Sequence, residues 1–183
     1  GHYFTKYDVQ ATVSLPITPQ LTAIIGPNPR GILLALAEVY QRKRAPKAAI
    51  RSLRQLHRRE PDDLVVVLSL VEMLVEDAKS KSSCQAVVNI TKEITNESGI
   101  HAAVLLYKAI ALRHLGLLVA SRNTLTAALR RKRNRSDEFL RAVRYERAAV
   151  YEMLGQKSRA RGDLESLYAD APDYEDVAGR LGL

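Results

Sequence analysis

The chain has 183 residues, of which 46% are hydrophobic and 26% charged, and its formal net charge is +8. This is the balance of an ordinary protein domain that can bury a core. No apolar run approaches the roughly 18 residues of a membrane-spanning helix. The single cysteine, Cys84, excludes an internal disulfide framework and a multi-cysteine zinc site.

Residues 1–29 are predicted to form an extended arm, because prolines border turns in "SLPITPQ" and "IIGPNPRG". We expect the arm to pack along the first helical hairpin as a cap. The apolar side chains available for this are Tyr3, Phe4, Tyr7, Leu15, Ile17, Ile24 and Ile25. No signal peptide is visible, and together with the lone cysteine this predicts a cytoplasmic location. The chain begins with Gly rather than Met, so it can be a piece of a longer protein.

The segment 33–61 predicts two helices joined by a short break. Apolar residues recur at helical spacing, first as Leu33, Leu36, Ala37 and Tyr40, then as Ala49, Ile50, Leu53 and Leu56. Pro46 suits the first turn of the second helix. The unit is therefore expected to be a helical hairpin.

The same layout returns along the chain. Residues 33–61 align with 144–172 at an offset of 111, which places Tyr40 on Tyr151 and Pro61 on Pro172. Residues 104–131 show two apolar helices separated by Gly116, and Gly155 marks the corresponding break in the last unit. Residues 64–95 match least well, with a longer turn at "DAKSKSSC". Internal repeats of this kind predict a stack of hairpins.

The pattern resembles the tetratricopeptide repeat (TPR), a helix-turn-helix unit of 34 residues. Signature positions of the first and last units are occupied by Leu33, Leu36, Ala37, Tyr40, Ala49, Leu53 and Pro61, and by Ala148, Tyr151, Gly155, Ala160, Leu164 and Pro172. The third unit keeps Leu105, Ala109, Gly116, Leu125 and Ala128. The resemblance implies an all-α, right-handed α-α superhelix of about four hairpins. The expected units are 30–63, 64–100, 101–137 and 138–172, with a short capping helix in 173–183. The tail "LYADAPDYEDVAGRLGL" resembles the tails of TPR proteins from actinobacteria, and the 19 Arg against nine Lys fit a GC-rich genome.

The resemblance also implies protein or peptide ligands in an inner groove lined by the first helix of each pair. The groove positions would be Leu34, Glu38, Gln41, Arg42, Leu68, Glu72, Leu106, Ile110, Arg113, His114, Tyr145, Ala149, Glu152 and Met153. The alternative is that the apolar members only pack between neighbouring repeats. Leu34 and Glu38 stand where chaperone-tail binders carry Lys and Asn, so a chaperone tail is not the expected ligand.

A second candidate surface is basic. It comprises Arg51, Arg54, Arg58, Arg130, Arg131, Lys132, Arg133 and Arg135. Rows of cations would suit phosphate contacts with nucleic acid or docking of an acidic protein. In "LRRKRNRSDE" the basic residues are expected to end a helix, and Ser136 is expected to cap the next one, with Asp137 and Glu138 in its first turn.

No sequence motif points to catalysis, since a phosphate-binding glycine loop, GxSxG and HExxH are all absent from the sequence. Glu72, Glu76 and Asp77 stand at helical spacing, which favours a solvated acidic face over a cation site. Cys84 lacks a visible base, which favours an unreactive thiol. The sequence therefore predicts a non-catalytic bacterial scaffold with no cofactor and no metal, which binds a protein partner, with nucleic acid as the alternative.

Overall fold

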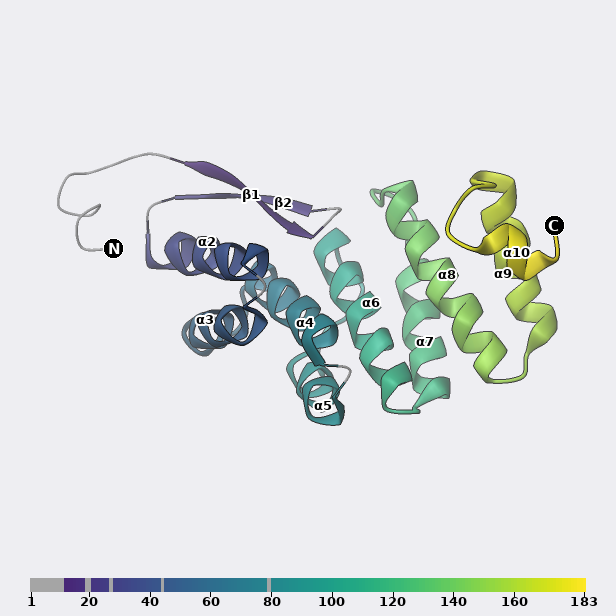
Figure 1. Ribbon diagram of the computed structural model, residues 1–183, viewed down its shortest axis with the longest axis horizontal. Helices are drawn as coiled ribbons and strands as arrows, with labels where there is room; N and C mark the ends of the chain where they lie inside the picture. Colours follow the sequence, from purple (N-terminus) through teal and green to yellow (C-terminus); the bar gives the residue numbers. More distant parts are fainter. Residues whose placement is uncertain (1–11, 19–20, 27, 44, 79) are drawn as a thin grey trace. The chain divides into compact units, whose positions relative to one another are not determined.

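The computed structural model describes residues 12–18, 21–26, 28–43, 45–78 and 80–183. Its elements in chain order (Figure 1) are β1 (Val13–Thr18), β2 (Leu21–Ile25), α2 (Pro29–Arg42), α3 (Pro46–Arg59), α4 (Leu64–Ala78), α5 (Lys81–Ile90), α6 (Gly99–His114), α7 (Leu118–Leu129), α8 (Asp137–Met153), α9 (Lys157–Asp170) and α10 (Val177–Leu181). The predicted all-α fold of stacked helical hairpins is confirmed. The chain forms two compact units, Gly1–Ala86 and Val87–Leu183. Among the described residues, no helix combines the length and apolar character needed to cross a bilayer.

In the first unit, α2 pairs with α3, and α3 packs on α4. The apolar stripe predicted for α3 is buried, with Ala49, Ile50, Leu53 and Leu56 facing the core. Helix α4 differs because 11 of its 15 residues are apolar, and positions 66–75 are buried throughout. A helix that is hydrophobic all round needs cover on several sides. The predicted long turn "DAKSKSSC" is mostly helical, because Asp77 and Ala78 end α4 and the residues from Lys81 to Cys84 begin α5.

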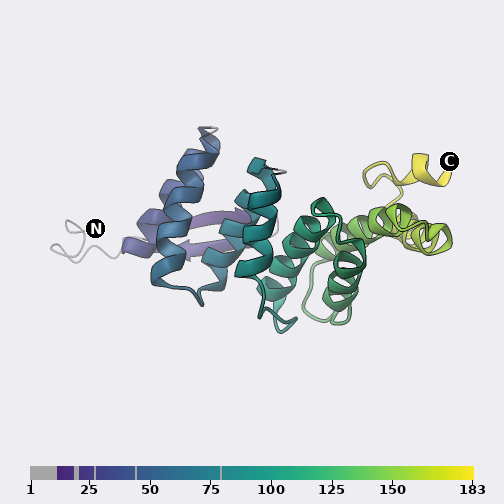
Figure 2. The same cartoon turned by 90° about the horizontal axis from the view of Figure 1, so that it is seen from below.

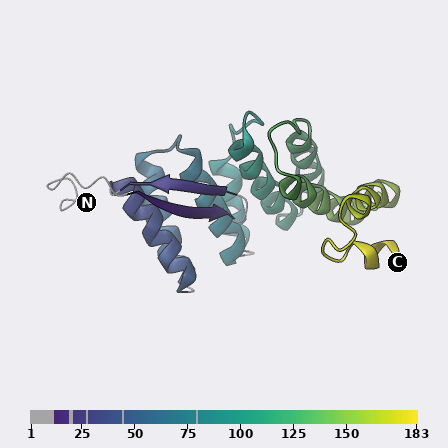
Figure 3. The same cartoon turned by 90° about the horizontal axis from the view of Figure 1, so that it is seen from above.

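The described part of the N-terminal arm is a β-hairpin rather than a single extended strand. Strands β1 and β2 pair antiparallel, from Val13 opposite Ile25 to Thr18 opposite Leu21, with an irregularity between Pro16 and Thr18. β1 contacts α4, and the hairpin lies over α2 and α4 (Figures 1 and 3). The arm thus covers helices of two predicted repeats, not the first alone. Tyr3, Phe4 and Tyr7 lie outside the described residues.

An ion pair joins the start of α2 to the start of α4. The Arg30 guanidinium donates to both carboxylate oxygens of Asp63, with Nη2 3.1 Å from Oδ1. Asp63 also accepts from the backbone N–H groups of Val65 and Val66, which caps α4. Burial acts to raise the pKa of Asp63, but the hydrogen bonds and charge of Arg30, with the two backbone donors, outweigh it and lower the pKa below its ordinary value.

The second unit is a continuous stack in which α7 packs on both α6 and α8, and α8 on α9. The larger apolar cluster joins α6, α7 and α8 through Ala102, Leu105, Ala109, Leu125, Ala128, Leu129, Phe139, Leu140, Val143 and Val150. Between α8 and α9, Arg147 donates two hydrogen bonds to the buried Asp163, at 2.8 and 2.7 Å. This pairing satisfies a carboxylate that would otherwise be costly to bury.

The predicted turn chemistry of this unit is confirmed at three points. Gly116 and Gly155 end α6 and α8 with positive φ values of 77° and 71°, a conformation that glycine adopts without strain. Ser136 caps α8 by accepting from the backbone N–H of Phe139 at 3.2 Å, and two acids follow in the first turn. The prediction for the basic run was wrong, because α7 ends at Leu129 and residues 130–135 form a loop.

Asn96 fixes the end of α7. Its amide nitrogen donates to the backbone oxygens of Ala127 and Ala128 at 2.8 and 3.1 Å, and its amide oxygen accepts from Arg135 Nη2 at 3.0 Å. These carbonyls belong to the last turn of the helix, where intrahelical donors run out. One side chain therefore ties the segment before α6 to the loop after α7.

We expect Asp63→Asn to destabilise the protein by about 1 to 2 kcal/mol near neutral pH, because an amide still caps α4 but loses the charged pair with Arg30. A carboxyl with a lowered folded pKa stabilises above its unfolded pKa, near 4, and loses this contribution as the pH falls through the folded value. The difference in urea unfolding free energy should therefore shrink below about pH 4. The exposed neighbour substitution Asp62→Asn is the control, and an equal effect of both would contradict the assignment.

Replacing Asn96 with Ala leaves two carbonyls at the end of α7 without their side-chain donor. We expect a loss of about 1 to 3 kcal/mol in the free energy of unfolding. Asn123→Ala provides a matched control, since its side chain is exposed and accepts from the neighbouring Arg122. Equal melting temperatures for the wild type and Asn96→Ala would show that water replaces the cap.

Candidate functional site

The predicted groove residues of α6 and α8 lie on two helices that touch directly. Leu106 and Ile110 are half-buried, and Leu106 packs against the α6–α7–α8 core. On α8, Ala149 is half-buried, whereas Met153 is 55% exposed. His114 is half-buried and has an interaction partner. The structure thus leaves apolar side chains accessible at these repeat positions.

Arg113, also predicted for the groove, holds the two helices together. Its guanidinium donates to both carboxylate oxygens of Glu146, with Nη2 3.5 Å from Oε2. Both side chains are largely withdrawn from solvent, at 26% and 13% exposure. The pair spans 33 residues in sequence, as does Arg30–Asp63 in the first unit. The two interactions bridge successive repeats in each case.

The C-terminal segment engages the remaining groove residues of α8. The Tyr145 hydroxyl donates to Asp176 at 2.7 Å, and its ring meets Tyr174 edge to face with the ring centres 5.8 Å apart. Arg180 lies 5.0 Å from the Tyr145 ring centre and donates to Glu152 at 2.7 Å. Burial, and then the bond to Asp176, raise the pKa of Tyr145. Tyr145 and Glu152 therefore anchor the capping segment and are already occupied.

The predicted groove residues of the first unit are mostly withdrawn from solvent. Leu34 is 2% exposed, Leu68 0% and Glu72 4%. Glu38 is half-buried and accepts from the exposed Arg42 at 2.7 Å, while the side chain of Gln41 lies outside the described residues. The β-hairpin lies over α2 and α4, the helices that carry these residues (Figures 1 and 3).

A signal for the β-hairpin was present in the sequence. The runs "VSLPIT" and "LTAII" are rich in β-branched residues and are separated by two residues, a spacing typical of a tight hairpin. The prolines on either side outweighed this signal in the prediction of an extended arm. Proline is tolerated at an edge strand or an irregularity, where no ladder hydrogen bond is lost.

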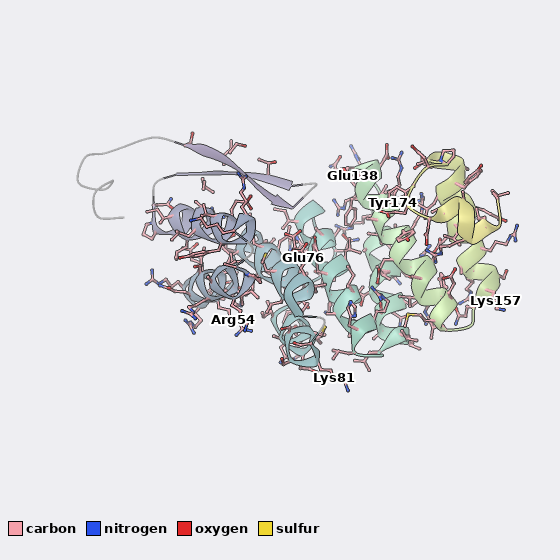
Figure 4. All side chains as sticks on the ribbon, in the orientation of Figure 1. Arg54, Glu76, Lys81, Glu138, Lys157 and Tyr174 are labelled. Atoms are coloured by element: carbon pink, nitrogen blue, oxygen red, sulfur yellow. The ribbon has the colours of Figure 1, made fainter. Side chains whose placement is uncertain are left out.

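The basic residues predicted for the first unit form a row on α3. Lys47, Arg51, Arg54 and Arg58 line a hollow of about 420 Å³, together with Ile50, Leu74 of α4 and Ser83 of α5. Figure 4 shows Arg54 on the side of α3 away from the strands. Consistently, α3 lies in front of the strands in Figure 2 and behind them in Figure 3. The row and the β-hairpin therefore occupy different sides of the unit.

The four cations of this row do not, as a group, stabilise helix α3. Among the described residues, no ion pair or hydrogen bond joins any of the four cations to another group. Like charges three or four positions apart on a helix destabilise it by about 0.2 to 0.5 kcal/mol per pair. Lys47 stands in the first turn, where the helix dipole disfavours a cation; only Arg58, in the last turn, gains from the dipole.

The basic residues predicted for the second unit divide into two groups. Arg130, Arg131, Lys132 and Arg133 are exposed on the loop after α7, and the first two line a hollow of about 780 Å³ that also includes Lys108 and Asn123. Arg135 is half-buried and is bonded to Asn96 and to the backbone of Asn134. Arg135 thus serves the loop and not a free basic surface.

The candidate reactive groups show no constellation for chemistry within the described residues. Cys84 is buried, and burial raises the pKa of its thiol, which disfavours the reactive thiolate. Glu72 is buried, Glu76 is exposed, and the side chain of Asp77 lies outside the described part of the chain. No group of three or more potential metal ligands occurs among the side chains that the structure describes.

The arrangement of the helices is similar to that of three solved structures of MamA. The crystal structure of the MamA protein shares 14% identity, covers 84% of this chain and 79% of its own, and has a TM-score of 0.68. A second crystal structure of MamA shares 14% identity, with coverage of 80% and 81% and a TM-score of 0.65. The MamA RS-1 ArsTM double mutant shares 13%, with coverage of 85% and 82% and a TM-score of 0.67. The fold is TPR-like. No protein-family model and no curated protein matches the sequence.

Replacing Arg54 with Glu should stabilise the protein by about 1 kcal/mol, because two like-charge contacts, with Arg51 and Arg58, become attractive pairs. Arg54→Gln removes the repulsion alone and should give about half of this gain. Chemical unfolding of the wild type, Arg54→Glu and Arg54→Gln at low ionic strength measures the three free energies of unfolding. A loss of stability in both variants would show that Arg54 has a favourable partner in the folded chain.

Proposed function

We propose that this chain is a non-catalytic protein-interaction scaffold that binds a peptide segment of a partner on the face formed by α6 and α8. TPR-like folds present the first helix of each hairpin to protein ligands. What supports this face is a contrast at one repeat position. Leu34 and Leu68 of the first unit are buried, whereas Leu106 of α6, at the same repeat position, is half-buried. Two further apolar side chains of this face are accessible, since Ile110 is half-buried and Met153 is 55% exposed.

The side chains of the proposed face suit a mainly apolar peptide segment that carries few polar groups. Leu106, Ile110, Ala149 and Met153 offer aliphatic and thioether contacts, and methionine adapts readily to different side chains. The Arg113–Glu146 pair fixes the spacing of the two helices. A helix or an extended peptide could use the accessible side chains as anchors at helical or alternate spacing. His114, at the end of α6, adds a polar boundary.

The same proposal includes a cellular location and a class of partner. We place the protein in a bacterial cytoplasm, where the free thiol of Cys84 would remain reduced. The partner is a protein, and no cofactor or metal is required for its capture.

The proposal is tested by selecting peptides from a random library on the full chain and measuring their affinities by fluorescence anisotropy. Ile110→Glu and Met153→Glu place a charge among apolar contacts and should each weaken the selected peptides by about tenfold or more. The matched control is Val119→Glu, since Val119 is 54% exposed on α7 and lies outside the face. Equal losses in all three variants, or peptides indifferent to them, would contradict the assignment.

A further inference from the structure

The basic row of α3 lines a hollow, to which Lys47, Arg51, Arg54 and Arg58 contribute. Ser83, in the first turn of α5, lines the same hollow, and Ser80 caps this helix by accepting from the backbone N–H of Ser83 at 3.2 Å. The N-terminal end of a helix carries partial positive charge. The four cations and the start of α5 therefore both favour negative groups.

The hollow also has an apolar lining, which consists of Ile50 of α3 and Leu74 of α4 and is called the floor below. Both residues belong to the core of the unit and are 8% and 1% exposed, so the floor offers a small apolar contact. A ligand with apolar side chains beside its negative groups would contact the floor and the cations at once.

The spacing of the cations matches that of another helix. Lys47, Arg51, Arg54 and Arg58 are separated by four, three and four positions, which corresponds to axial steps of about 6, 4.5 and 6 Å. A second α-helix has the same rise per residue, so carboxylates at the same spacing would meet the cations along the whole row. Because the sequence four, three, four is the same from either end, the match holds for both directions of a partner helix.

We propose that the α3 groove, formed by Lys47, Ile50, Arg51, Arg54, Arg58, Leu74 and Ser83, binds an acidic amphipathic helix of a partner protein. The groove is a second interaction surface, on a different unit from the α6–α8 face, and its existence does not depend on that face. Four cations that have no ion pair or hydrogen bond among the described residues, together with the apolar floor, are the features that such a helix would satisfy. The occupant contributes carboxylates to the row and aliphatic side chains to the floor.

A phosphodiester ligand fits these observations less well. A hollow of about 420 Å³ admits side chains rather than a duplex, whose contacts would fall on the rims alone. The residues that line it include no Phe, Tyr or Trp on which unpaired bases could stack. Nucleic acid would therefore use the cations but not the floor.

The test uses the full chain and a labelled helical peptide of about 18 residues whose glutamates repeat the four, three, four spacing, with leucines on the adjoining face. Fluorescence anisotropy at about 150 mM salt should detect saturable binding. The triple variant R51Q/R54Q/R58Q should weaken it by about tenfold or more. The control variant R130Q/R131Q/R133Q removes the same charge from the exposed loop after α7 and should change the affinity less than about twofold.

Two further probes decide the nature of the ligand. A peptide with Gln in place of each Glu should lose the binding if carboxylates meet the row, and one with Ser in place of each Leu should weaken it if the floor is used. Single-stranded and duplex DNA of about 20 nucleotides should bind more weakly than the acidic peptide. DNA that binds more tightly, and loses this affinity in the α3 variant alone, would overturn the proposal in favour of nucleic acid.

The remaining outcomes are equally decisive. Equal losses in the two triple variants would mean attraction by net charge, and an absence of saturable peptide binding would mean that the groove does not accept an acidic helix; either result overturns the proposal. Circular dichroism checks that each variant remains folded. Protection of the α3 backbone amides from hydrogen exchange on adding the peptide provides a readout that needs no variant. Ile110→Glu should leave the acidic peptide unaffected, which separates this test from that of the α6–α8 face.

Discussion

Most of the helices that the structure describes have an apolar stripe that they bury against neighbouring helices, and the rest of the structure depends on this constraint. A helix of 10 to 17 residues is marginal alone in water, so its stability comes from packing. The pairing of α6 with α7 and of α8 with α9 buries one stripe, and contact between successive hairpins buries the next. Where no further helix follows, another segment of the chain must cover the apolar surface. The segments that do so, and the surfaces left accessible, therefore distinguish this protein from a plain repeat array.

The two units carry different covers. In the first unit, a β-hairpin lies over α2 and α4, the helices whose Leu34 and Leu68 were expected to meet a ligand and are buried. At the C-terminal side, Tyr174, Asp176 and Arg180 engage Tyr145 and Glu152 of α8 through an aromatic contact, hydrogen bonds and an ion pair. Val177 and Leu181 complete this cap against Ala148 and the helix that follows α8. Tyr145 and Glu152 stand at positions expected to line a ligand groove, but here they hold the C-terminal segment.

Two sets of charged groups have different consequences. The pairs Arg30–Asp63, Arg113–Glu146 and Arg147–Asp163 bridge helices or their flanking segments and are largely withdrawn from solvent. Removing one member of such a pair leaves a desolvated charge, so these residues primarily determine stability and register. The cations of α3 have no partner within the described chain and repel one another. A surface that costs stability without an internal compensation is typical of sites kept for binding.

The sequence alone determined the helical hairpins, because their causes are local. The spacing of apolar residues, Pro46 at the start of α3, Gly116 and Gly155 at the turns, and Ser136 before α8 each act within a few residues of the chain. The all-α TPR-like fold followed from these signals. The end of α7 at Leu129 could not be predicted from local signals. Asn96, about 30 residues earlier in the chain, donates hydrogen bonds to the backbone oxygens of Ala127 and Ala128 in the last turn of this helix.

The accessibility of the candidate sites was decided by the tertiary structure. Leu34 and Leu106 occupy the same repeat position, yet the first is buried in the unit that carries the β-hairpin and the second is half-buried. Arg113 was predicted for the groove, but it pairs with Glu146. Arg135 was predicted for the basic surface, but it donates to Asn96. A repeat pattern specifies which way a side chain points from its own helix. Whether that side chain meets solvent, a bridging partner or a distant segment of the chain depends on contacts between residues far apart in sequence, which no local pattern contains.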